Sequence, residues 1–131
     1  MFKLHSVGSA KTAPYELYTA TNSEAITLGE ALVLTSGKLT KCGATATPEF
    51  IAMKATNSNP GVEIPVMRVM EDMVFETTFA ADASANNEGT LVTIHTDGAQ
   101  VTATYTNGKF YITKKLGTGD TGTKVRGMFR R

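Results

Sequence analysis

The sequence predicts a single all-β domain built of hairpins, because two tight-turn signals lie inside one continuous β-prone run, Leu91 to Lys114. Asp97-Gly98 and Asn107-Gly108 both favour type I′ turns, whose two central residues need a positive φ. Two-residue turns at both places put the apolar side chains of three strands on one face. These residues are Val92, Ile94, Val101, Ala103, Tyr105, Phe110 and Ile112. In addition, no segment keeps a 3.6-residue apolar period over three turns, so we expect no long helix.

The two turns also predict the register of this meander. The first turn pairs Ile94 with Val101, and the second pairs Tyr105 with Phe110. His95 then lies on the polar face of the sheet. Because both turns agree on one buried face, we expect a three-stranded antiparallel meander.

The length and net charge of the chain limit the classes of protein to which it can belong. The chain has 131 residues and a net charge of +1, and a domain of this length buries roughly two-thirds of its unfolded surface. A nucleic-acid-binding domain of this size is usually more basic, so we expect no nucleic-acid partner. The single cysteine, Cys42, cannot form an internal disulfide, which favours folding in a reducing cytoplasm.

Residues 1–15 are expected to form an extended N-terminal arm, and residues 16–131 a single β domain. Gly8-Ser9-Ala10 and Pro14 interrupt any regular pattern in the arm. The segment lacks the apolar core of a signal peptide, and no run approaches the ~18 apolar residues that span a bilayer. We therefore expect no membrane partner. A short strand is predicted directly after the arm, at Tyr15–Ala20.

Two strand units are predicted in the next part of the chain. Residues 31–42 form a hairpin around Ser36-Gly37, which pairs Leu34 with Leu39. Residues 49–55 form another strand. The Asn-, Pro- and Gly-rich stretch that follows is the strongest loop signal in the chain.

The long segment 62–79 is predicted to form two strands. Pro65 has no N–H for the ladder, so either the first strand lies at a sheet edge or the proline nitrogen faces outward. Glu71-Asp72 interrupts the apolar pattern and predicts a bend or tight turn. Alternate residues of the second strand share one face. These are Met73, Phe75, Thr77 and Phe79. A last strand is predicted over residues 123–129.

Few residues suggest chemistry. His95 and Asp97 lie two residues apart, but a metal site needs several converging ligands, so we expect Asp97 to serve its turn and His95 to face solvent. Cys42 is expected to be a small core residue. Gly117–Gly122 lacks the Gly-Lys-Ser/Thr ending of a phosphate loop. We therefore expect no catalytic residue, no metal and no cofactor.

The C-terminal end carries a small basic cluster formed by Arg126, Arg130 and Arg131. Two interpretations fit this cluster. It is either a solvated tail or a contact with an acidic partner surface.

Short strands, glycine turns and prolines follow a recognisable rhythm across residues 28–129. The rhythm runs through Leu28–Cys42, Pro48–Met53, Gly61–Val69, Asp97–Val101, Asn107–Thr113 and Val125–Phe129. It resembles that of the head-decoration (capsid cement) proteins of tailed bacteriophages, of the β-tulip type. Residues 1–15 lie outside the resemblance.

The resemblance implies a compact, barrel-like or sandwich-like β domain without enzymatic activity. It implies binding to the major capsid protein on the exterior of the expanded capsid, after assembly in the host cytoplasm. It also implies a homotrimer that bridges neighbouring capsid subunits. The candidate capsid or oligomer interface consists of Phe2, Lys3, Leu4, Lys11, Arg126, Arg130 and Arg131. Deletion of residues 1–12 is then expected to leave the fold intact and to weaken capsid binding.

The alternative is a phage fibre or tail module that binds carbohydrate. Sugar sites usually need an exposed aromatic platform beside polar groups. Tyr105 is expected to face the core, which leaves Tyr18 and Tyr111 as the candidate platform residues.

Overall fold

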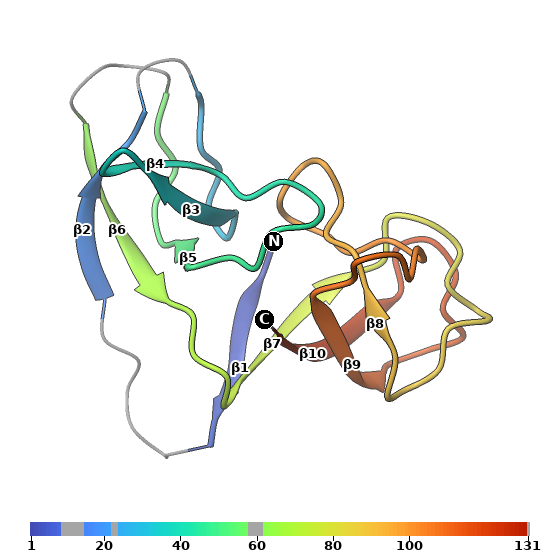
Figure 1. Cartoon of the computed structure of the whole chain (residues 1–131). Helices are drawn as coiled ribbons and strands as arrows, with labels where there is room; N and C mark the ends of the chain where they lie inside the picture. Colours follow the sequence, from blue (N-terminus) through green and yellow to red (C-terminus); the bar gives the residue numbers. More distant parts are fainter. Residues whose placement is uncertain (9–14, 22–23, 58–61, 131) are drawn as a thin grey trace.

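The chain folds into two antiparallel sheets of five strands each, as the computed structural model in Figure 1 shows. The structure describes residues 1–8, 15–21, 24–57 and 62–130, and these ranges contain no helix, hence none long and apolar enough to cross a membrane. Sheet A has the strand order β1-β7-β10-β9-β8, and sheet B has the order β2-β6-β5-β3-β4. The strands are β1 (Lys3–Val7), β2 (Tyr15–Thr19), β3 (Ala31–Thr35), β4 (Lys38–Lys41), β5 (Phe50–Ala52), β6 (Glu63–Arg68), β7 (Met73–Thr78), β8 (Leu91–Val92), β9 (Phe110–Lys115) and β10 (Lys124–Phe129). The predicted all-β, sandwich-like fold is confirmed, and the sheets do not close into a barrel.

The main core lies between the two sheets and follows from the alternation of side chains along the strands. In β7 the alternate residues Met73, Phe75 and Thr77 are buried, and Phe79 continues the pattern, as predicted. The ring of Phe129 in β10 lies 5.3 Å from that of Phe75. Ala31 and Ile51 of sheet B belong to the same apolar cluster, so both sheets share this core.

Sheet B buries side chains on both of its faces. Its inner face curls around a second apolar cluster that includes Leu32, Phe50 and Ile64. The curl brings the two edge strands together at one point, where Ala20 bridges to Leu39 of β4. All three residues of β5 are buried because one face of this strand meets the shared core and the other meets the second cluster.

The predicted hairpin at Ser36-Gly37 is confirmed. The two turn residues have φ values of 51° and 77°, and the type I′ turn requires positive values at both positions. Leu34 pairs with Leu39 in the register that follows from such a turn.

The predicted meander is correct at its first pairing only. Ile94 pairs with Val101, as predicted. The turn that joins them is not type I′, because Gly98 has a positive φ and Asp97 does not. The N–H of Gly98 instead donates to the carbonyl oxygen of His95 at 2.9 Å.

The predicted pairing of Tyr105 with Phe110 is wrong. Phe110 pairs with Val92 of β8 on one side and with Phe129 of β10 on the other. Both edges of β9 are therefore occupied by other strands. The segment that carries Tyr105 is left outside this ladder, and its side chain is 53% exposed.

β6 is an interior strand of sheet B, so the edge-strand alternative for Pro65 is wrong. Pro65 pairs with Leu17 of β2, and its carbonyl oxygen accepts the N–H of Met53 at 3.0 Å. The proline nitrogen therefore lies beside the end of β5, where the ladder finishes and no N–H is needed. The predicted turn at Glu71-Asp72 is present between β6 and β7.

The N-terminal segment is part of the fold rather than a free arm. β1 pairs with β7 at the edge of sheet A, and the adjacent Phe2 is only 2% exposed. The pattern-breaking residues that suggested an arm begin at Gly8, after this strand, and residues 9–14 lie outside the described part of the chain. Deletion of residues 1–12 would therefore remove a strand and a core side chain, contrary to the expectation that the fold survives it.

Candidate functional site

The N-terminal members of the predicted interface divide between core and surface. The ring of Phe2 lies 5.9 Å from that of Phe110 and 5.1 Å from that of Phe129. Leu4 is half-buried against the same cluster, whereas Lys3 is exposed. Phe2 cannot reach a partner without leaving the core, so Lys3 is the member of this group that a partner can contact freely.

Arg126 and Arg130 are engaged by contacts within the chain. Arg126 forms an ion pair with Glu76 at 3.0 Å. Arg130 donates to the carbonyl oxygen of Glu71 at 3.2 Å. Two members of the predicted interface, Lys11 and Arg131, lie outside the described residues.

An apolar groove of about 270 Å³ lies between the N-terminal segment and the outer face of sheet B. Its walls include Met1, Leu4, Leu28, Ile51, Met53 and Met67. Ile51 is buried at the bottom of the groove, whereas Leu28 and Met53 are exposed at its rim. Sequence reasoning missed this groove, because its walls come from segments far apart in the chain.

The groove continues across sheet B onto the edge strand β2. Tyr15 pairs with Met67, and Leu17 pairs with Pro65, so these side chains share one face of the sheet. Tyr15 and Leu17 are 65% and 58% exposed. We call the surface formed by the groove and these two side chains the apolar face. A continuous exposed apolar surface on a small domain is typical of a protein contact site.

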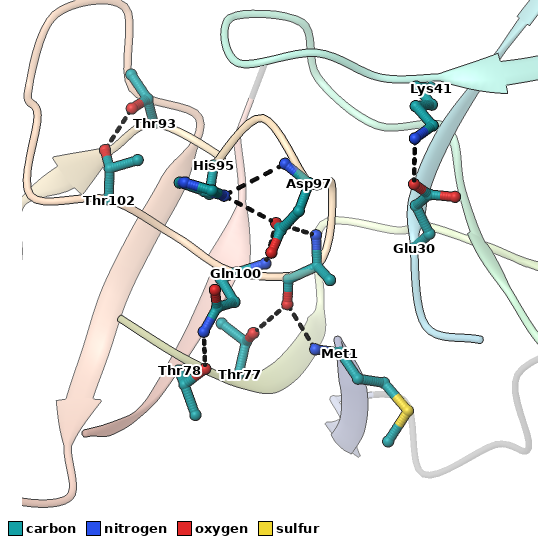
Figure 2. Close-up of polar contacts among 11 residues, drawn as sticks. Met1, Glu30, Lys41, Thr77, Thr78, Thr93, His95, Asp97, Gln100 and Thr102 are labelled. Atoms are coloured by element: carbon teal, nitrogen blue, oxygen red, sulfur yellow. Dashed lines mark hydrogen bonds and ion pairs between the residues drawn. The ribbon is translucent and has the colours of Figure 1, made fainter. Parts of the chain in front are cut away.

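Polar contacts hold loop 95–100 against sheet A beside the N-terminus, as Figure 2 shows, and one backbone hydrogen bond extends them to sheet B. The N–H of Ala31 in β3 donates to the carbonyl oxygen of Gly98 at 2.8 Å. The carbonyl oxygen of Ala99 accepts from the Thr77 hydroxyl at 2.7 Å and from the Met1 amine at 2.6 Å. Loop 95–100 is thereby fixed to both sheets.

Glu30 is a buried acid at this junction, with 1% exposure. Its Oε2 accepts the N–H of Thr27 at 3.1 Å, and its Oε1 lies 3.6 Å from Nζ of Lys41. Burial raises the pKa of Glu30, although the Thr27 N–H and the Lys41 ammonium oppose that shift. Sequence reasoning missed this residue as well. The sequence feature that could have identified Glu30 is its position directly before the apolar run Ala31–Leu34.

His95 and Asp97 lie together without forming a ligand set. Nδ1 of His95 lies 3.2 Å from Oδ1 of Asp97, and both side chains are exposed. The same Oδ1 accepts the N–H groups of Ala99 and Gln100, so Asp97 serves the turn as predicted. Burial alone would raise the pKa of Asp97, but these hydrogen bonds and His95 lower it. Within the described ranges, no three His, Cys, Asp or Glu side chains converge as metal ligands.

Cys42 is a buried free thiol, as its sequence context predicts. Its Sγ donates to the carbonyl oxygen of Ala46 at 3.3 Å. Burial, with a smaller contribution from Glu49, raises the pKa of the thiol to about 12. The group stays protonated at neutral pH and is a poor nucleophile.

A larger cleft of about 700 Å³ lies near the junction of β6 and β7. Its walls include Thr47, Glu49, Arg68, Glu71, Asp72 and Phe129. Arg68 donates twice to Glu16, at 2.7 and 2.8 Å, and its guanidinium lies 4.8 Å from the centroid of the Phe50 ring. The guanidinium in this wall is therefore already occupied by a partner within the chain.

The fold and these surfaces define an all-β protein with an exposed apolar face. No protein-family model matches the chain, and no curated protein matches it. The geometry of the apolar face and the strand-and-turn rhythm of residues 28–129 are therefore the grounds on which a function can be assigned.

Proposed function

We propose that this chain is a non-enzymatic structural protein that attaches to the outer surface of an expanded bacteriophage capsid and stabilises contacts between major capsid subunits. The apolar face carries the proposal, because it offers an exposed contact surface on a two-sheet scaffold. The resemblance to head-decoration proteins supplies the identity of the partner. In this role the protein is assembled in the host cytoplasm and works on the exterior of the virion.

The composition of the apolar face suits attachment to another protein. Leu17, Leu28 and Met53 are all exposed in the free chain. Fully burying a side chain of this size contributes about 1.5–3 kcal/mol. Among the residues that the structure describes, Lys3 is the one lysine in the lining of the groove, and it is exposed. An apolar centre with a polar rim is the usual organisation of a protein–protein interface.

Co-sedimentation of the purified chain with expanded and unexpanded capsids tests the proposal. We expect saturable binding to expanded particles alone. Leu28→Asp should weaken this binding by about tenfold or more, because a charge would be buried without a partner. Leu116→Asp is the matched control, since Leu116 is a similarly exposed leucine that does not line the groove.

Several outcomes would contradict the proposal. Unchanged binding of Leu28→Asp would remove the apolar face from the mechanism, and equal binding to both capsid forms would remove the specificity for expanded particles. We also propose the homotrimer that the resemblance implies. The mass of the protein in solution and its stoichiometry on particles test that part.

The alternative, a carbohydrate-binding fibre or tail module, is supported by the exposure of Tyr15 and Tyr105. Of the tyrosines expected to form a platform, Tyr18 lies 5.0 Å from the Phe50 ring, and Tyr111 is half-buried. A glycan array tests this function. Hits that disappear in Tyr15→Ala or Tyr105→Ala would support it, and an array without hits would count against it.

A further inference from the structure

A row of charged side chains crosses the outer face of sheet A. The register places Lys3 opposite Glu76. Arg126 lies opposite both Glu76 and Lys114. The row therefore runs across β1, β7, β10 and β9, which are neighbouring strands in Figure 1. Adjacent strands are about 4.8 Å apart, so three cations and one carboxylate lie along a short line.

The lysines of this face are the cations available to pair with an acidic partner. Arg126 and Glu76 form an ion pair and offset each other's charge. Lys3, Lys114 and Lys124 are exposed, and none forms an ion pair with a residue that the structure describes. The face is therefore positive, although the whole chain has a net charge of only +1.

A hollow of about 190 Å³ opens between two of these lysines. Lys3 and Lys124 line it together with Thr78 and Glu76. Oγ1 of Thr78 accepts a hydrogen bond from Gln100 at 2.7 Å, so its own hydrogen is available as a donor. Two ammonium groups and a hydroxyl are the kind of donors that a carboxylate accepts from.

A complementary acidic surface is present on the same chain, at the turn between β6 and β7. Glu71 and Asp72 are both exposed there. The turn is anchored through its backbone, because the carbonyl oxygen of Asp72 accepts the N–H of Gly8 at 2.9 Å. Arg130 holds the carbonyl oxygen of Glu71 rather than its carboxylate. Neither carboxylate forms an ion pair within the described ranges.

We propose that the hollow on sheet A binds the Glu71-Asp72 turn of a second copy of this chain. Charge complementarity selects this partner, since one surface carries unpaired lysines and the other unpaired carboxylates. The neutralised Arg126–Glu76 pair interrupts the row of lysines, so the face offers no continuous cationic track for a polyanion such as nucleic acid. The contact joins two different patches, so successive copies form a closed ring or a filament. The proposal does not depend on attachment to a capsid.

The mass of the purified full-length chain at low and high salt tests the contact, measured by sedimentation or light scattering. We expect assemblies at about 0.05 M salt that dissociate at about 1 M, where charges more than about 3 Å apart are screened. Lys124→Glu should be monomeric at both salt concentrations. Lys54→Glu makes the same change on an exposed lysine that follows β5 of sheet B, and this variant should assemble like the wild type.

Charge exchange provides a second and more specific test. Glu71→Lys should also be monomeric alone, because it places lysine against lysine. A mixture of Lys124→Glu and Glu71→Lys should assemble again, since the intact Glu71 of the first variant meets the intact Lys124 of the second, and the new carboxylate of the first meets the new ammonium group of the second. A wild type that stays monomeric at low salt, a Lys124→Glu variant that assembles normally, or a mixture that stays monomeric would each overturn the proposal. Capsid binding is a separate readout, so failure of either proposal can be recognised independently.

Discussion

Glu30 lies at the junction between the two sheets, so the charge of its side chain affects the stability of that junction. It packs so closely against loop 95–100 that a Cβ added at Gly98 would lie 2.8 Å from its Cγ. Burial is the main cause of its raised pKa. The carboxyl therefore binds a proton more tightly in the folded chain than in the unfolded chain.

We predict that the wild type loses stability relative to Glu30→Gln as the pH rises. Because the folded pKa is raised, the stabilisation from protonation is complete below the unfolded pKa of about 4.3 and is lost as the pH rises through the folded pKa. Urea unfolding of both proteins between about pH 4 and pH 7 measures the change. Glu63→Gln, at an exposed position, is the control and should follow the wild type. A constant difference between wild type and Glu30→Gln would contradict this account.

At the scale of elements, the N-terminal segment stabilises the fold through Phe2, the aromatic residue directly before β1. Phe2→Ala should lower the free energy of unfolding by about 3–5 kcal/mol, because it removes a ring that packs against Phe110 and Phe129. The exposed neighbour serves as the control, and Lys3→Ala should cost no more than about 0.5 kcal/mol. Denaturant unfolding measures both values. Equal and small losses would place Phe2 outside the core in solution.

Two turn signals of similar strength predicted strand registers, of which one is confirmed and one is wrong. Competition between strands for the same edge explains the difference. At Ser36-Gly37 the flanking strands β3 and β4 are free to pair, and the predicted register is confirmed. At Asn107-Gly108 the following strand, β9, pairs with β8 and β10 instead. A turn signal reports local backbone preference and cannot show that a distant strand competes for the same edge. Alternation within single strands, such as β7, was predictable because it needs no partner.

The candidate surfaces were less predictable than the strands, because each combines distant segments. The apolar face places Tyr15 beside Met67, a pairing that no pattern along one strand can show. Lys3 and Arg126 stand at opposite ends of the sequence, and the structure brings them into one row across sheet A. At Glu71 the sequence pattern predicts a bend or tight turn and nothing more. Its proposed role depends on a second surface that sequence alone does not place.

At the scale of the whole molecule, the shared core predicts one cooperative unfolding transition. The main cluster takes Ala31 and Ile51 from sheet B together with Phe75 from sheet A. Loss of either sheet exposes the core of the other, so neither should persist alone. Far-ultraviolet circular dichroism and tyrosine fluorescence should give coincident transitions, since Tyr18 reports on sheet B and Tyr111 on sheet A. Two separate transitions would show that the two sheets unfold independently.

The ring contact between Phe2 and Phe129 joins positions near the two ends of the sequence. During translation Phe2 leaves the ribosome well before its partner Phe129 in β10. β7 also lacks one of its two neighbours in sheet A until β10 has been synthesised. Before that point, the nascent chain therefore exposes the Phe2 ring and one edge of β7. Aggregation of the unfinished chain is most favoured in that interval, and the exposed surface is covered once β10 pairs with β7.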